Sequence, residues 1–185
     1  MRNLSNRTQA LVSQQLIVDA LLKLMECWSF SNITVSQICQ EAKVARQTFY
    51  RHYQDKFEVI EQHLFRLALK YKEINTPSVS DIVGNLTTMY LKPPFPRELL
   101  VMLKKHDLFH LIEQCCLEVA PLILPETRLE PLLASEKYDR YHIGFVAATV
   151  TCVLRLWVEG GFAETPEELA ALSFAFFSGT AVLTQ

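Results

Sequence analysis

Apolar residues recur at three- and four-residue steps through the first part of the chain, which is the repeat of a helix with one buried face. The series consists of Val12, Leu16, Ile17, Ala20, Leu21, Leu24 and Trp28. It predicts a helix that closes the core of a three-helix unit, with two shorter helices following it.

The first short helix is predicted from a capping box, because Thr34 is followed three residues later by Gln37. Ile33 and Ile38 occupy the staple positions on either side of this helix start. The linker 42–45 has a length that a helix-turn-helix allows. In the second short helix Phe49 and Tyr53 are four residues apart, so they share a face that can pack inward.

The remaining side chains of the second short helix are cationic, amide, hydroxyl and aromatic, which suits the major groove of DNA. Arg46 would pair with guanine, Gln47 with adenine, and the Thr48 methyl group would touch thymine. Phosphate contacts are expected from Thr34, Tyr50, Arg51, His52 and Lys56, while Ser36 would reach either a base or a phosphate. The alternative interpretation is a solvated helix face without function.

This segment, with Ile33-Thr34-Val35 before it and Asp55-Lys56 after it, is similar to the amino-terminal domain of TetR-family transcriptional regulators. The central signature runs from Thr48 to Tyr53, and the similarity covers residues about 8 to 72. The resemblance implies an all-helical homodimer that binds a palindromic operator in double-stranded DNA and responds to a small effector. It also implies repression as the usual mode of action, or an adaptor that works through a protein partner.

Two positions depart from the family pattern, since Lys43 stands where glycine is common and Ala45 where Ser or Thr is common. A left-handed backbone at Lys43 would cost on the order of a kcal/mol. Ala45 cannot cap the next helix with its side chain, which forgoes about 0.5–2 kcal/mol.

Further helices are predicted over about 81–91, 97–105, 107–120, 136–159 and 166–183, after a helix that begins behind Asp55 with a second capping box to Glu58. A turn-rich break spans 75–80, and prolines interrupt 91–96 and bracket a break at Pro121 and Pro125. The expected fold is all-α, with a DNA-binding domain over 1–56, a connecting helix over 57–74, and a ligand-binding and dimerisation domain over 75–185.

The last two helices are apolar enough to form a dimer interface. Gly160-Gly161 ends the first of them, and Thr165-Pro166 with Glu168 starts the second. The expected interface residues are Ile143, Val146, Val150, Val153, Trp157, Leu169, Leu172 and Phe176. The alternative is that both helices cap the core of one protomer. This end of the chain also resembles a TetR subgroup that includes regulators of dihydroxyacetone utilisation.

A small apolar or mixed-polarity effector would meet aromatic and imidazole groups on helices that flank an internal cavity. The candidates are Met102, His106, Phe109, His110, Tyr141 and Phe145. An enzyme would have to use His106 or His110 with Cys115 or Cys116, but no third orienting group accompanies them, so no catalytic residue is expected. Ordinary packing is favoured over redox or metal sensing for these two cysteines.

The net charge of −2 gives no sign of nucleic acid, but its distribution does. Residues 1–56 carry seven Lys and Arg against four acids, whereas the remainder is acidic. Five cysteines lack paired metal spacing, so neither a metal nor a cofactor is expected, and their odd number suits a reducing cytoplasm. The amino-terminal region does not read as a signal peptide, and no run is long enough to cross a membrane.

Overall fold

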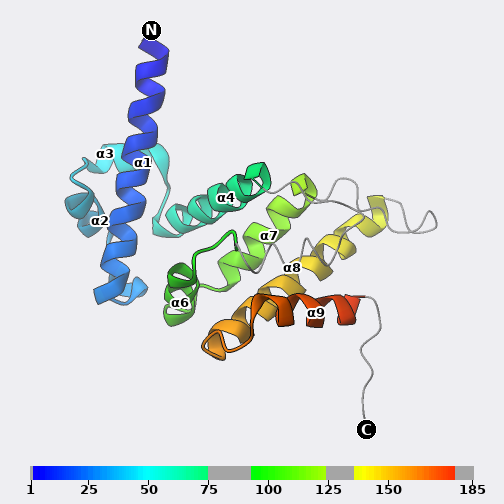
Figure 1. The fold of residues 1–185 in the computed structure, drawn as a ribbon. Helices are drawn as coiled ribbons and strands as arrows, with labels where there is room; N and C mark the ends of the chain where they lie inside the picture. The colour runs from blue at the N-terminus through cyan, green and yellow to red at the C-terminus, as the bar shows by residue number, and fades with distance from the viewer. Residues whose placement is uncertain (1, 75–92, 124–135, 178–185) are drawn as a thin grey trace. The chain divides into compact units, whose positions relative to one another are not determined.

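The computed structural model describes residues 2–74, 93–123 and 136–177, and within these ranges the regular elements are helices (Figure 1). The all-α prediction is confirmed. The chain divides into two compact units, Met1–Leu64 and Phe65–Gln185. Within the described ranges, each helix is too short or too polar to cross a membrane.

The first unit is built on α1 (Arg2–Cys27), which packs against α2 (Val35–Ala42) and α3 (Arg46–His52) (Figure 1). A short 3₁₀ helix, η1 (Phe30–Asn32), connects α1 to α2, and the beginning of α4 (Lys56–Ile74) completes the unit. The buried side chains of this core are Ile17, Val18, Leu21, Met25, Phe30, Ile33, Ile38, Phe49, Tyr53, Val59, Ile60 and Leu64.

The predicted stripe of α1 is only partly buried. Ile17, Ala20 and Leu21 are in the core, but Val12, Leu16 and Trp28 are exposed by 53%, 45% and 54%. Helix α1 has 26 residues, whereas α2 and α3 have 8 and 7. The two short helices therefore cover only part of the apolar face of α1. Trp28 lies beyond the last helical residue.

The second unit contains the rest of α4 together with α6 (Arg97–Lys105), α7 (His110–Ile123), α8 (Glu136–Glu159) and α9 (Pro166–Phe177). Helix α7 packs along α8, and α6 contacts α8 (Figure 1). The bounds predicted for 97–105 and 136–159 are confirmed. The predicted helix over 81–91 and the break over 75–80 lie outside the described residues, as do the last six residues of the predicted helix over 166–183.

Helix α7 begins three residues later than predicted, because Asp107 adopts a left-handed backbone with φ 58°. The amide of Leu108 donates to the carbonyl of Leu103, and that of Asp107 donates to Lys104, which closes α6 in a Schellman motif. The predicted break at Pro121 is wrong, since α7 continues through it to Ile123. A proline near the end of a helix removes only one late hydrogen bond, so the helix can tolerate it there.

Cation–π contacts and a hydrogen bond connect the start of α6 to the end of α8 and the loop that leads to α9. The Arg97 guanidinium lies 4.8 Å from the ring centroids of both Trp157 and Phe162. The Trp157 indole donates to the carbonyl of Glu164 at 3.0 Å. Trp157 is therefore an internal residue of the second unit, with 1% of its surface exposed.

Candidate nucleic-acid interface

Helix α2 starts with the predicted capping box. The Thr34 hydroxyl accepts from the amide of Gln37 at 3.3 Å, and the Gln37 side chain accepts from the amide of Thr34 at 2.8 Å. The Thr34 hydroxyl also donates to Gln37, at 2.8 Å. Ile33 and Ile38 are both buried, so the staple is confirmed as well. These contacts fix the start of α2 and the direction in which the exposed Ser36 projects.

The turn between α2 and α3 is a Schellman motif around Lys43, whose φ of 54° and ψ of 40° are left-handed. The amide of Val44 donates to Cys39 at 3.0 Å and that of Lys43 to Gln40 at 3.3 Å. Lys43 thus pays the cost that glycine would avoid. Ala45 is the N-cap of α3 and makes no side-chain cap bond.

Helix α3 is fixed by its inner face and presents polar groups on the others. Phe49 and Tyr53 are buried, as predicted from their spacing. On the flank toward α2, the Arg46 guanidinium donates to the hydroxyl of Ser36. Tyr50 is 59% exposed and its ring meets the edge of Phe49, with centroids 5.5 Å apart.

The structure brings the expected DNA-contacting residues together on α3 and the start of α2, with one exception. Thr34, Ser36, Arg46, Gln47, Tyr50 and Arg51 are exposed, whereas Thr48 and His52 are half-buried. Helix α3 carries no acidic residue. The exposed residues of α3 and of the start of α2 can therefore offer hydrogen-bond donors and positive charge to a ligand.

The exception is Lys56, whose ammonium points into the first unit. Its Nζ donates to the carbonyls of Phe30 at 2.5 Å, Ser31 at 3.1 Å and Ile33 at 2.8 Å, and lies 4.7 Å from the Phe30 ring centroid. Burial lowers the pKa of Lys56, although the charge of Asp55 opposes this. An ammonium has three donors, so the expected phosphate contact competes with three existing bonds. Asp55 also occupies the amides of Phe57 and Glu58 at the start of α4.

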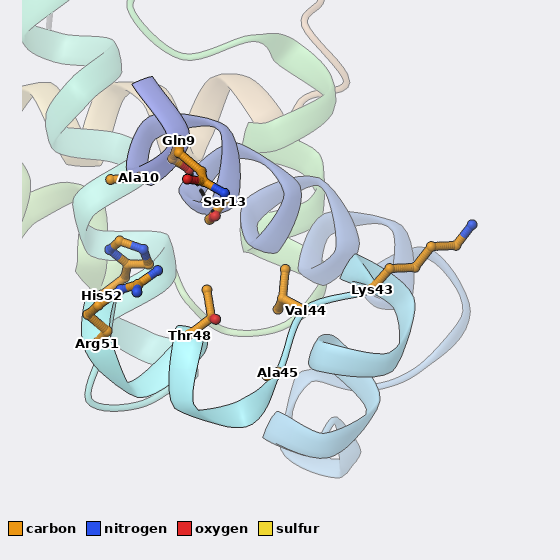
Figure 2. A pocket seen from close by; sticks show the side chains of 9 residues that line it. All are labelled: Gln9, Ala10, Ser13, Lys43, Val44, Ala45, Thr48, Arg51 and His52. Carbon is orange, nitrogen blue, oxygen red and sulfur yellow. Dashed lines mark hydrogen bonds between the residues drawn. The ribbon is translucent and has the colours of Figure 1, made fainter. Parts of the chain in front are cut away.

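A hollow of about 800 Å³ lies on the other flank of α3, toward α1 (Figure 2). Figure 2 shows Gln9 and Ser13 on α1 facing Thr48 on α3, while the Lys43 side chain extends away. The lining residues Gln9, Ser13 and Lys43 were missed by sequence reasoning, because isolated polar positions on a long helix and in a turn form no motif. Burial, and then the charge of Arg51, lowers the pKa of His52.

The expected effector residues divide between inward and outward positions. Phe109 is buried, Met102 and His106 are half-buried, and His110, Tyr141 and Phe145 are exposed. Cys115 is buried with its pKa raised to about 12, and Cys116 has its pKa raised to about 11, in both cases chiefly by burial. Both thiols are protonated at neutral pH and are therefore poor nucleophiles. Within the described ranges, no three His, Cys, Asp or Glu side chains gather as metal ligands would.

The expected interface residues also divide. Trp157 and Leu169 are buried within one chain, Ile143, Val146, Val150 and Val153 are half-buried, and Leu172 is exposed; the side chain of Phe176 lies outside the described residues. The apolar side chains of α8 that remain most exposed are instead Tyr141, Phe145 and Leu156, at 61%, 59% and 60%. The internal face of α8 packs on α7 and α6, which explains why Trp157 is buried and the four α8 residues before it are half-buried.

These features define a helix-turn-helix unit, and comparison with known proteins shows what it is similar to. Residues 17–62 match the family of bacterial regulatory proteins, tetR family. The HTH-type dhaKLM operon transcriptional activator DhaS of Lactococcus lactis subsp. lactis (strain IL1403) is 36% identical over 55 residues. That similarity covers 30% of this chain and 29% of the relative. The similarity to TetR-family regulators therefore lies in the amino-terminal unit of this chain.

Two solved structures share the fold over most of the chain. The dihydroxyacetone kinase operon activator DhaS is 20% identical, with a TM-score of 0.50, and the TetR transcriptional regulator from Streptococcus agalactiae 2603V is 19% identical, with a TM-score of 0.57. In both cases the match covers 92% of this chain and 96% of the other. At these identities the likeness concerns the fold, and it extends the TetR-like architecture beyond the amino-terminal unit.

Proposed function

We propose that this protein is a transcriptional regulator that reads double-stranded DNA with α3. The observation that carries the proposal is the contrast between the two sides of this helix. Phe49 and Tyr53 anchor it in the core, whereas Arg46, Gln47 and Arg51 are exposed. A rigid helix with such side chains can place donors against base edges, while its cations neutralise phosphates.

Arg46 is the residue that we propose reads a base. Its guanidinium can form two parallel hydrogen bonds to guanine, and the contact with Ser36 holds it at the start of α3. Gln47 and Thr48 would add contacts to adenine and thymine, while Thr34, Tyr50, Arg51 and His52 would position the backbone.

A gel shift with DNA from upstream of the protein's own gene tests this. We expect a discrete complex, and Arg46→Ala should relax the preference at one base pair of each half-site. Arg155→Ala is the matched control, because Arg155 is an exposed cation on α8 in the second unit. Unchanged base preference in Arg46→Ala would exclude this residue as the reader, and absence of any complex would exclude the proposed function.

We also propose a homodimer on a palindromic operator, with the exposed apolar side chains of α8 at its interface. A two-fold dimer places the α3 helices of its two protomers about one helical turn of DNA apart, roughly 34–36 Å. Large exposed apolar side chains such as Tyr141, Phe145 and Leu156 favour contact with a second copy. Sedimentation of Phe145→Glu should show a monomer, while Val101→Glu, on α6, should sediment like the unmodified chain.

The direction of regulation depends on where the operator lies relative to the promoter. Repression is the usual mode of the family, whereas the Lactococcus relative is an activator. We propose repression when the operator overlaps the promoter, which a reporter with the operator moved upstream would test. Loss of repression in the moved arrangement is the expected result.

Control by a small effector is proposed for the second unit, where Met102 on α6 and His106, the C-cap residue of that helix, are half-buried. Dihydroxyacetone is a suitable first probe, since one relative is the activator of a dihydroxyacetone kinase operon. Binding would raise the unfolding temperature of the chain. His106→Ala should abolish that increase.

A further inference from the structure

The hollow beside α3 has a lining suited to an anion. Its nine residues come from α1, the turn and α3, namely Gln9, Ala10, Ser13, Lys43, Val44, Ala45, Thr48, Arg51 and His52. Two of them are cations and none is an acid. Asp and Glu would repel an anion, so a polar lining without them admits negative charge.

The hollow lies on the opposite flank of α3 from the Arg46–Ser36 contact. An α-helix has 3.6 residues per turn, so Thr48 and His52, four apart, share one flank. Both line the hollow and face α1, whereas Arg46 bonds to Ser36 on α2. The recognition helix is therefore bordered by α2 on one side and by the amino-terminal half of α1 on the other.

Two side chains at the hollow bear on its ligand, one buried and one exposed. The Nε2 atom of His52 is buried and has no hydrogen-bond partner among the residues that the structure describes. The side chain of Gln9 is exposed and, in Figure 2, lies across the hollow from Thr48. The Ser13 hydroxyl already donates to the backbone carbonyl of Gln9 at 2.9 Å. Of the two polar lining residues on α1, Gln9 is therefore the one that can donate to a ligand, through its side-chain amide.

The geometry of DNA supplies the ligand. A major groove about 12 Å wide admits one helix, and a sugar-phosphate backbone runs along each of its edges. A helix in the groove thus has a phosphate strand on both flanks. When α3 reads bases beside Ser36, the second strand passes on the α1 side.

We propose that the hollow seats a phosphodiester of the second DNA strand, with the exposed amide of Gln9 on α1 as its donor and Arg51 on α3 as its charge. This inference rests on the proposed DNA binding. It extends the interface to Gln9 and Ser13, which precede the segment matched by the family, residues 17–62.

The test uses the full chain and the duplex bound by the unmodified protein. Gln9→Glu places a carboxylate at the hollow and should weaken binding by about tenfold or more, because like charges repel across an interface. Gln15→Glu is the matched control, because Gln15 is also exposed on α1 but does not line the hollow, and the same charge change there should alter affinity by less than about twofold. Circular dichroism confirms that both variants remain folded.

A second measurement identifies the phosphate. Replacing single phosphates of the duplex by uncharged methylphosphonates should reveal one position that weakens binding by the unmodified chain and by Gln15→Glu, but no longer by Gln9→Glu. Inorganic phosphate, titrated in a thermal unfolding assay, shows whether a free anion occupies the hollow instead.

The outcomes separate cleanly. Equal affinities of Gln9→Glu and Gln15→Glu, or equal sensitivity of both to every methylphosphonate, would overturn the hollow as a phosphate site while leaving the reading helix intact. Stabilisation by inorganic phosphate that Gln9→Glu removes, without any difference in DNA affinity, would overturn the DNA assignment in favour of a free anion. Failure of the unmodified chain to bind any duplex would overturn the proposed function itself.

Discussion

Replacing Lys56 with methionine separates a folding role from a DNA-binding role. The ammonium joins the start of α4 to three carbonyls around η1, those of Phe30, Ser31 and Ile33. Methionine keeps much of the aliphatic chain but removes the charge and all three donors. We expect Lys56→Met to loosen the entry to α2, which follows η1 directly.

The size of the effect follows from these contacts. One hydrogen bond that involves a charged group contributes about 1.5–3 kcal/mol. The three bonds of Lys56 share a single ammonium, and its burial lowers the pKa, so desolvation offsets part of their gain. We therefore expect the variant to lose about 2 kcal/mol, close to the value of one such bond. For a domain the size of the first unit, Met1–Leu64, a loss of about 2 kcal/mol lowers the unfolding temperature by roughly 8–16 °C.

Thermal unfolding followed by circular dichroism measures the loss, and DNA binding over several salt concentrations measures phosphate contacts. Lys43→Met is the control for stability, because Lys43 is exposed and the change should shift the free energy by less than about 0.5 kcal/mol. A folding role for Lys56 would be refuted if Lys56→Met unfolded at the original temperature while the salt slope of its DNA binding fell by about one, which is the signature of a lost phosphate contact.

Three further predictions concern the same unit. Lys43→Gly should stabilise the chain by about 0.5–1 kcal/mol in urea unfolding, since glycine adopts the left-handed backbone without strain, and no gain would argue against strain there. Because burial lowers the folded-state pKa of His52 below its ordinary 6.5, the unfolded chain binds more protons. Stability should therefore fall as pH drops below 6.5, and His52→Gln should lessen this dependence; identical pH profiles would contradict the assignment. Ser36→Ala should relax base preference at the same position as Arg46→Ala, with little added effect in the double variant, whereas additive effects would show that Ser36 acts independently.

Local features of the sequence predicted the helix-turn-helix well. Thr34 and Gln37 cap a helix whatever packs against it, and the spacing of Phe49 and Tyr53 fixes one face. Lys43 shows the same principle, because the family's preference for glycine at this turn predicts a left-handed residue, which the structure has at φ 54°. Such patterns depend on a few neighbouring residues, so they can be interpreted without knowledge of the rest of the fold.

Features that depend on distant partners could not be predicted. Val12 and Leu16 continue the stripe of α1, but periodicity does not reveal where the covering helices end. On α8, apolar residues surround the helix, so the pattern could not distinguish the internal side with Trp157 from the external side with Phe145. Lys56 reads as a free cation, because its partners are carbonyls contributed by a segment about 25 residues earlier.

Selection from a pool of randomised duplexes by the full chain tests most directly whether α3 reads DNA. We predict enrichment of an inverted repeat whose half-sites are about one helical turn apart, and loss of preference at one base pair per half-site for Arg46→Ala. A pool that stays random after selection by folded protein would contradict the claim that α3 reads DNA sequence.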